Sequence, residues 1–499
     1  MDAFFQVLNG FAISLQPHNL WYTFVGVLMG TVIGVLPGIG PSAAMALLIP
    51  FCYDLSSTSA LIMMAGIYYG AQYGGAITSV LINTPGESSS VMTAIDGYQM
   101  ARKGRAGAAL AISAWGSFIG GTIAIVALTI FAVPLTKAAL SFGPPEYFML
   151  MLVAMTCVFS LTGKSPAKGM MSTMIGLAIA TVGTDLQSGQ IRYGFGVPAL
   201  QEGIDFIIVV VGVFAVGEVL SALAERFYST DEIIKLDGKL MLSKEDWGRS
   251  AKPVARGSLI GFLVGVLPGA GATIASIISY SVEKSNAKNP EEFGKGAIEG
   301  VAGPETANNA ASTGSMVPLL TLGVPGSGST AVLLGAFIMF GIQPGPLLFQ
   351  NHPDVVWGLV NSMYVGNVML LLLNLPLIFI FVRLLYIPKG LLFPLVLVLS
   401  TIGIFAINNL EFELFLCLLF GLLGVVFRKL DIPLAPMVLA VVLGSLMEQS
   451  FRQAMTISGG SLSIFLHGGV SIGLAVLCVA ILVYTIFKSL IKRAPAQPA

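Results

Sequence analysis

A short motif occurs twice in this chain, and its two copies constrain the fold more than any other feature. Residues 34–40 read Gly-Val-Leu-Pro-Gly-Ile-Gly, and residues 265–271 differ from them only at the sixth position. Further along, residues 74–86 align without a gap on residues 314–326, and both segments end in Pro-Gly. Matched Pro-Gly breaks in two halves of an apolar chain are the best sequence indication of a transporter's binding site. The chain is therefore predicted to consist of two copies of one unit.

Composition places both units in a membrane. Apolar residues make up 55% of the chain and charged residues 10%, whereas soluble domains carry about 25% charged residues. Most of the chain consists of apolar runs of about 20 residues, the length of a bilayer-spanning helix. We expect an all-α polytopic membrane protein with roughly 12–14 transmembrane segments, broken or re-entrant at the Pro-Gly motifs. The net charge is zero, and no basic patch indicates nucleic-acid binding.

Loop charge predicts how the chain is divided. Residues 226–256 are the main polar interruption, and their Lys and Arg residues place this linker in the cytoplasm. The predicted parts are a first transmembrane repeat (1–225), the cytoplasmic linker (226–256), a second transmembrane repeat (257–462), and an extra terminal helix with a short cytoplasmic tail (463–499).

The same charge rule predicts opposite orientations for the two repeats. Arg102, Lys103 and Arg105 place the loop after the run 59–83 inside, whereas its counterpart, residues 342–354, contains no Lys or Arg and is placed outside. The halves would then form an inverted repeat with a cytoplasmic C-terminus. Three single basic residues are exceptions to the rule, namely Lys137, Arg192 and Arg452.

The first pair of motifs predicts two breaks in membrane helices. Proline lacks the N–H that a helix requires, and glycine permits non-helical backbone angles. Freed amides at a restarting helix suit a carboxylate, and freed carbonyls at the preceding helix end suit Na⁺. Hydroxyl side chains follow both motifs at aligned positions. The substrate-binding residues predicted for this pair are Pro37, Gly38, Gly40, Ser42, Pro268, Gly269, Gly271 and Thr273.

The second pair of motifs adds polar groups to nominal membrane sequence, where they are costly and usually functional. The substrate-binding residues predicted here are Asn83, Pro85, Gly86, Ser88, Asn308, Asn309, Pro325, Gly326 and Ser327. The glycines at 26, 30 and 34 and at 257, 261 and 265, by contrast, form small-residue stripes that favour close helix packing over a binding role.

Two carboxylates near the breaks are candidates for ion coupling. Glu87 and Glu305 are each candidates to carry the coupling proton, although Glu87 also fits the first turn of a helix, where acidic residues are favoured. The three histidines lack metal-ligand spacing, and no nucleophile–base pair stands out, so neither a resident metal, a cofactor nor a catalytic residue is predicted. A channel is the other alternative, but two inverted halves with broken helices favour alternating access.

At these motifs the chain resembles the large membrane subunit of the bacterial tripartite tricarboxylate transporters, the TctA family. The resemblance also rests on residues 205–218 and on residues 443–448 with Arg452, and it covers residues 20–460. It implies a carboxylate carrier in the bacterial inner membrane, driven by a Na⁺ or H⁺ gradient. It further implies two partners, a small transmembrane subunit and a periplasmic solute-binding protein that delivers substrate.

The predicted function is therefore that of the large transmembrane subunit of a cation-driven uptake transporter for di- or tricarboxylates. The alternative is a stand-alone secondary transporter, or a channel, for another small solute. The resemblance does not identify the substrate, because the family serves citrate, other di- and tricarboxylates, and aromatic acids.

Overall fold

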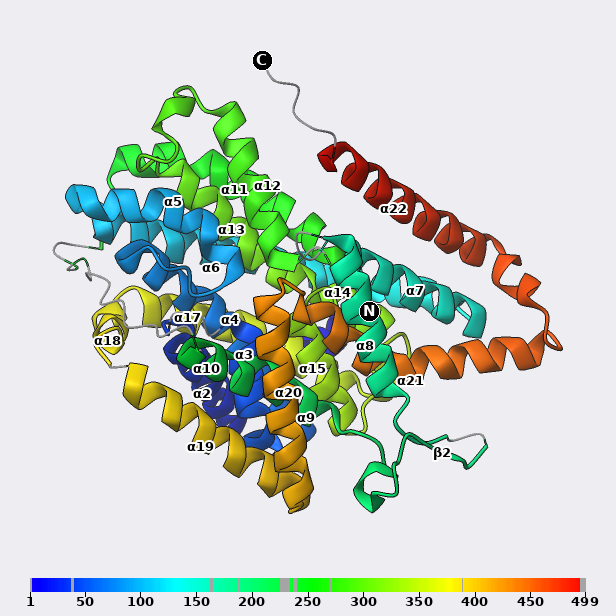
Figure 1. Cartoon of the computed structure of the whole chain (residues 1–499). Helices are drawn as coiled ribbons and strands as arrows, with labels where there is room; N and C mark the ends of the chain where they lie inside the picture. The colour runs from blue at the N-terminus through cyan, green and yellow to red at the C-terminus, as the bar shows by residue number, and fades with distance from the viewer. Residues whose placement is uncertain are drawn as a thin grey trace.

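Helices make up most of the chain (Figure 1). The computed structural model describes residues 2–36, 40–161, 165–185, 188–224, 234, 236, 240–269, 271–387 and 389–493. The first part of the chain forms α1 (Asp2–Ser14), α2 (Pro17–Gly34), α3 (Pro41–Leu48), α4 (Ser57–Ile82), α5 (Val91–Met100), α6 (Ala106–Ala139), α7 (Pro144–Leu161), α8 (Pro166–Ala180), α9 (Phe206–Val210) and α10 (Gly217–Ala224).

The later part of the chain is helical as well. It forms α11 (Lys244–Val266), α12 (Gly271–Asn286), α13 (Glu299–Gly314), α14 (Met316–Leu322), α15 (Gly328–Met339), α16 (Leu348–Asn351), α17 (Pro353–Asn374), α18 (Ile378–Leu384), α19 (Lys389–Asn408), α20 (Glu411–Lys429), α21 (Leu434–Ile457) and α22 (Gly469–Arg493).

Short elements connect or interrupt these helices. Single 3₁₀ turns are η1 (Ile49–Cys52), η2 (Ser88–Ser90), η4 (Pro198–Leu200), η6 (Pro290–Glu292) and η7 (Leu462–Leu466). Two π-helical segments, η3 (Ala101–Arg105) and η5 (Val211–Val216), lie within longer helices. A small antiparallel hairpin, which the sequence did not predict, pairs β1 (Gly183–Thr184) with β2 (Ile191–Arg192).

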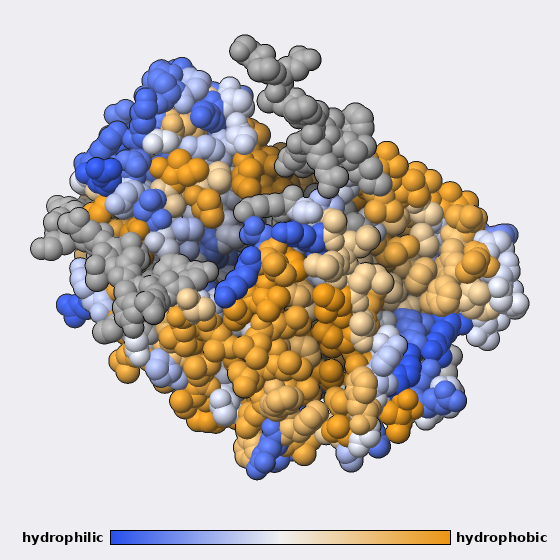
Figure 2. Space-filling view, in the orientation of Figure 1, coloured by the Kyte–Doolittle hydropathy of each residue, from blue (hydrophilic) through white to orange (hydrophobic). Residues whose placement is uncertain are grey.

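The class of the protein agrees with its composition. Within the described residues, four helical segments are long and apolar enough to cross a membrane, namely Ser88–Ala139, Phe206–Ala224, Pro353–Asn374 and Leu434–Ile457, and five shorter apolar helices accompany them. Figure 2 shows apolar side chains across the middle of one face, over α19 and α20, and hydrophilic side chains gathered at the upper left beside α5. An all-α membrane protein is thus confirmed, whereas the number of spans and the inverted orientation of the halves stay predictions.

Helices are interrupted at each repeated motif. The α2 helix ends at Gly34 and α3 begins at Pro41, while α11 ends at Val266 and α12 begins at Gly271. At the second pair, α4 and α14 both end in a residue with left-handed backbone angles, since Asn83 has φ 54° and Gly323 has φ 71°. These residues occupy aligned positions, so the two segments stop their helices by the same local device.

The glycine stripes serve helix packing in both halves. A Cβ atom at Gly26, Gly30 or Gly34 of α2 would collide with the α4 backbone. A Cβ atom at Gly257 or at either of the next two stripe positions of α11 would collide with the α13 backbone. The helix pairs α2–α4 and α11–α13 therefore approach so closely that only glycine fits, as small-residue stripes predict.

One buried carboxylate joins the two halves near this packing. Asp96 of α5 is fully buried, and its Oδ1 accepts hydrogen bonds from the backbone N–H groups of Gly294, Gly296 and Ala297, at 2.8, 2.7 and 2.9 Å. Its Oδ2 accepts a hydrogen bond of 2.8 Å from the Tyr280 hydroxyl. Because a buried carboxylate is stable only with such partners, Asp96 holds the segment between α12 and α13 in place.

Charged residues tie the end of the predicted linker to its surroundings. Arg105 pairs with Asp246, and Arg249 Nε lies 2.7 Å from Glu299 Oε1. The Arg249 Nη2 atom lies 2.7 Å from Glu292 Oε2. These residues anchor the start of α11, which runs without a break through the predicted boundary between residues 256 and 257.

Two of the three basic residues that break the charge rule belong to one ion-pair cluster. Arg452 of α21 lies 2.8 Å from Asp185 and 2.5 Å from Glu448. Arg192 of β2 lies 2.8 Å from the same Glu448. The two arginines and two carboxylates balance in charge, so this surface carries no net positive charge from them. The cluster also attaches the small hairpin to α21.

Candidate functional site

The four Pro-Gly segments meet at one cavity of about 720 Å³, which we call the motif pocket. Pockets for small molecules commonly measure roughly 300–1,000 Å³. The residues of the predicted site that line it are Gly40, Ser42, Pro85, Gly86, Glu87, Ser88, Gly269, Gly271, Thr273 and Ser327. The structure therefore brings together segments from both halves of the chain that are far apart in sequence.

Hydroxyl groups from opposite halves pair across this pocket. Ser42 Oγ lies 3.0 Å from Ser329 Oγ, and Thr273 Oγ1 lies 2.8 Å from Ser88 Oγ. Ser42 follows the first motif of the first half, and Ser329 follows the second motif of the second half. Thr273 and Ser88 are related in the same way, with the two halves exchanged. Hydroxyls both donate and accept hydrogen bonds, so these pairs can turn to donate to a bound anion.

Three helices begin at the wall of the pocket. Gly40 is the N-cap of α3, Ser327 is the N-cap of α15, and Gly271 opens α12. Ser327 and Thr330 form a reciprocal capping box, and Glu87 and Ser90 form the equivalent box before α5. A helix start presents unpaired N–H groups and the positive end of the helix dipole, so this convergence favours an anionic ligand.

Backbone contacts hold the second half of the site together. The Gly269 N–H donates to the Gly326 carbonyl at 3.0 Å, which joins the first and second motifs of this half directly. Gly269 has φ 81° and Gly271 has φ 61°, angles that other residues adopt at a cost. In this second copy of the motif, glycine is therefore required by the turn itself, whereas Gly40, the counterpart of Gly271 in the first copy, has an ordinary φ of -73°.

Glu87 is the predicted coupling carboxylate that lines the motif pocket. It accepts hydrogen bonds from Ser89 and, at 3.3 Å, from the Asn308 amide of α13. Ser89 also lines the pocket, while Asn308 lies behind it and is fully buried. The sequence predicted both Glu87 and Asn308 as site residues, and the structure places them in direct contact.

Glu305 lies deeper than the pocket wall. It is fully buried on α13, its Oε1 accepts a hydrogen bond from Thr93, and its Oε2 has no hydrogen-bond partner among the described residues. Asn309, one turn further on, donates to Ser117 at 2.7 Å and to the Glu305 carbonyl at 3.1 Å. Both predicted residues thus belong to a buried polar layer between α13 and the helices α5 and α6.

The remaining predicted residues flank the motif pocket. Asn83 caps α4 and is exposed, and Pro268, Pro325 and Gly326 lie within the turns without lining the cavity. Pro37 and Gly38 lie outside the described residues.

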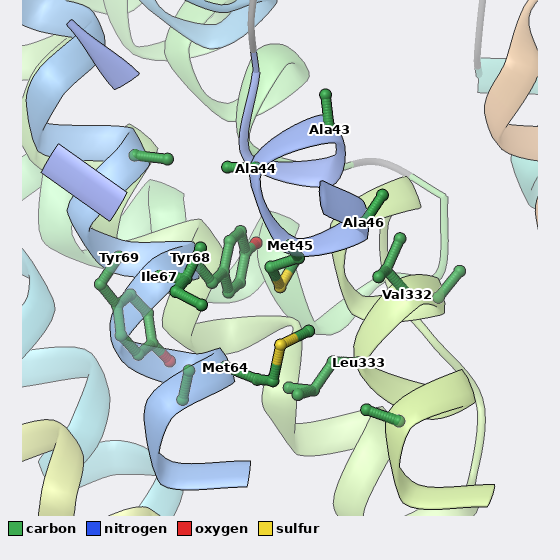
Figure 3. Close-up of a cluster of buried hydrophobic side chains, with 14 of the residues drawn as sticks. Ala43, Ala44, Met45, Ala46, Met64, Ile67, Tyr68, Tyr69, Val332 and Leu333 are labelled. Carbon is green, nitrogen blue, oxygen red and sulfur yellow. The ribbon is translucent and has the colours of Figure 1, made fainter. Parts of the chain in front are cut away.

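A second cavity of about 680 Å³ lies at the far end of the helices that line the motif pocket. In α15, Gly328 and Ser329 line the motif pocket, whereas Gly335 and Ile338 line the second cavity. Buried side chains fill the helix turn between them, and Figure 3 shows Met45 of α3, Tyr68 of α4 and Leu333 of α15 gathered in one cluster. This packing separates the two cavities.

Sequence reasoning missed several residues of the motif pocket. Tyr68 and Gln72 of α4 carry no motif that distinguishes them from other helix residues. Phe214 lies in a π-helical segment that no sequence pattern predicted. Arg428 was not among the predicted site residues, yet it lines the pocket and its Nη2 lies 2.8 Å from Glu218 Oε2. The sequence did contain one indication of this pair. Arg428 and Glu218 both fall within or beside apolar runs, where ionisable residues indicate function.

Comparisons with known proteins identify the family of the chain. The family model described as "Tripartite tricarboxylate transporter TctA family" matches residues 20–439. An "Uncharacterized 52.8 kDa protein in TAR-I ttuC' 3'region" of Agrobacterium vitis is 48% identical over 488 residues, which cover 97% of this chain and 97% of that protein. An "Uncharacterized protein in TAR-II ttuC' 3'region" of the same organism is 47% identical over 222 residues, or 44% of this chain and 92% of that protein. The chain therefore belongs to the tripartite tricarboxylate transporter TctA family.

Proposed function

We propose that the chain is the large transmembrane subunit of a cation-driven uptake transporter for di- or tricarboxylates. The observation that carries this proposal is the motif pocket, where hydroxyls of both halves and the starts of three helices surround a cavity large enough for a small organic anion. Family membership supports the same assignment, because the family is one of tricarboxylate transporters.

Alternating access is the mechanism we infer. The motif pocket and the second cavity share α15, α21 and the α9–α10 segment, and a packed layer separates them. A carrier needs such a barrier, which moves from one side of the site to the other. The repeated contacts of α2 with α4 and of α11 with α13 support two related units, which we propose to be inverted relative to each other.

Coupling would reside in the acidic groups beside the substrate. Glu87 lines the motif pocket, and Glu305 lies in the polar layer behind it. A dicarboxylate that enters a pocket with an ionised Glu87 meets like charge, so a proton on the carboxylate or a bound Na⁺ would favour binding. We propose that one of these cations moves with the substrate down its gradient, and backbone carbonyls at the broken helices are further possible Na⁺ ligands.

The assembly we propose contains a small transmembrane subunit and a periplasmic solute-binding protein, in a bacterial inner membrane. The charge rule places the linker and the C-terminus in the cytoplasm and residues 342–354 in the periplasm. The binding protein would then deliver substrate from the side of the 342–354 loop.

Transport by the reconstituted complex tests this function. Proteoliposomes that contain the chain, its small subunit and its binding protein should accumulate radiolabelled succinate, tartrate or citrate against a concentration gradient. Uptake should saturate with substrate and should require an imposed Na⁺ or pH gradient. Uptake that never exceeds equilibration would contradict a coupled carrier, and no uptake of any of the three acids would contradict the substrate class.

A further inference from the structure

Among the described residues, one basic side chain lines the motif pocket. Arg428 is the only Lys or Arg among the described residues that line the cavity, and two carboxylates, Glu87 and Glu218, line it as well. Hydroxyls and helix starts favour an anion but carry no full charge. A ligand with two carboxylates therefore finds one cationic partner in this pocket, and that partner is Arg428.

The guanidinium of Arg428 is held in a defined place between two helices. Its Nη2 lies 2.8 Å from Glu218 Oε2, across the contact of α20 with α10. A Cβ atom at Gly217 would lie 2.9 Å from Nη1, and one at Gly424 would lie 3.4 Å from it. The guanidinium thus rests against backbone that lacks side chains on both helices, so its position is fixed by packing as well as by charge.

The ion pair remains accessible from the cavity. The side chains of Arg428 and Glu218 are 24% and 28% exposed, and both line the motif pocket. Glu218 lies two residues after the end of the π-helical segment η5, and π-helical turns occur frequently at functional sites. A ligand in the pocket can therefore reach the same guanidinium that Glu218 now holds.

We propose that Arg428 binds one carboxylate of the transported acid, and that Glu218 is the internal carboxylate which the substrate displaces. This inference rests on the proposed function. Guanidinium forms two parallel hydrogen bonds to a carboxylate, so the carboxylates of Glu218 and of the substrate compete for the same donors. The hydroxyl pairs and helix starts then receive the second carboxylate, and the site selects dicarboxylates over monocarboxylates of equal size.

The competition gives the two partners opposite expected effects. Replacing Arg428 removes the recognition group and weakens binding, whereas Glu218→Gln removes the competitor and strengthens binding. If the ion pair were purely structural, loss of either partner would disturb the site and weaken binding. The sign of the Glu218→Gln effect therefore separates the two roles.

Binding of succinate, tartrate and citrate to the purified membrane complex tests the proposal. Succinamate, in which an amide replaces one carboxylate of succinate, is the matched ligand. We expect Arg428→Gln to raise the apparent Kd for succinate about tenfold or more and to reduce the preference for succinate over succinamate. Arg428→Lys should fall between Arg428→Gln and the wild type, because it keeps the charge and loses the paired donors.

Two further variants complete the design. Glu218→Gln should lower the apparent Kd for succinate, and Lys429→Gln should leave it unchanged, because Lys429 is the exposed neighbour of Arg428 and does not line the pocket. Wild-type affinity in Arg428→Gln, or weakened binding in Glu218→Gln, would overturn the proposal while the proposed function stands. If the wild-type complex binds none of the three acids, both the proposal and the proposed function are overturned. If Arg428→Gln does not fold, Arg428→Lys and Glu218→Gln decide the question.

Discussion

Ser42 Oγ lies 3.0 Å from Ser329 Oγ, although the two residues belong to different halves of the chain. Thr273 and Ser88 repeat this relationship at 2.8 Å. Each half thus contributes one broken helix and one hydroxyl-bearing helix start to a shared pocket. Neither half could form the site alone, which explains why the chain retains both copies of each motif.

These hydroxyl pairs should contribute to substrate binding. We expect Ser42→Ala and Thr273→Ala each to raise the KM for uptake about fivefold, because a hydrogen bond to a charged ligand is worth roughly 1–3 kcal/mol. Thr401→Ala is the matched control, since this exposed hydroxyl of α19 contacts only the carbonyl of its own helix turn in the described structure. Uptake kinetics in proteoliposomes decide the matter, and equal effects at all three positions would count against a binding role.

Two glycines of the first motif region should respond differently to alanine. A Cβ atom at Gly40 would approach only the Glu87 side chain, at 3.8 Å, whereas one at Gly30 would collide with the α4 backbone. Gly40→Ala should therefore leave the folded yield unchanged and lower transport by narrowing the pocket. Gly30→Ala should lower the folded yield.

Uptake per folded molecule, with the yield measured by size-exclusion chromatography, separates these effects. The account would be wrong if Gly40→Ala transported like the wild type, or if Gly30→Ala gave a normal yield of folded protein.

The positions of the helix breaks could be predicted from sequence because they are local. Pro and Gly act within a turn, and α3 begins at Pro41, directly after the first motif. The pairing of Ser42 with Ser329 could not be predicted, since it depends on how the halves are docked. Arg428 was missed for the same reason, because its partner Glu218 lies on another helix.

Burial was equally hard to predict from the chain alone. Glu87 and Glu305 looked alike in sequence, yet Glu87 lines the pocket and Glu305 lies in a polar layer behind it. Asp96 gave no sequence signal at all, because its partners are backbone N–H groups more than one helix away.

Asp96 should be a stability residue without a direct role in binding. Asp96→Ala removes the acceptor of three backbone N–H groups and of the Tyr280 hydroxyl, which should destabilise the fold by about 3 kcal/mol. Thermal unfolding of the purified protein measures this change, with the exposed residue in Asp354→Ala as the control. A melting temperature equal to that of the wild type would show that the buried contacts are not needed.

Glu87→Gln should separate binding from coupling. Glutamine mimics the protonated carboxyl, so the variant should bind and exchange substrate but fail to accumulate it under a pH gradient. Exchange and gradient-driven uptake are measured in the same proteoliposomes. Accumulation equal to that of the wild type would make Glu87 a helix-start carboxylate only, and the coupling role would pass to Glu305 or to a bound Na⁺.

The inverted orientation of the halves can be tested by labelling from the two sides of the membrane. Cysteine at Lys239, in the predicted linker and outside the described residues, should react only from the cytoplasm. Cysteine at Asn351, an exposed residue at the end of α16, should react only from the periplasm. An impermeant thiol reagent applied to right-side-out and inverted vesicles gives the answer, and labelling of both from one side would rule out the inverted repeat.

Protection of a cysteine in the motif pocket tests the central claim most directly. Thr273 lines the pocket and is partly exposed to it, whereas the four native cysteines are all buried. Alkylation of Thr273→Cys should slow as succinate, tartrate or citrate is added. This protection should reach its maximum at the substrate concentration that saturates uptake. Thr401→Cys, on the outer surface of α19, should be unaffected. An unchanged alkylation rate at Thr273→Cys, at substrate concentrations that saturate uptake, would contradict binding in the motif pocket.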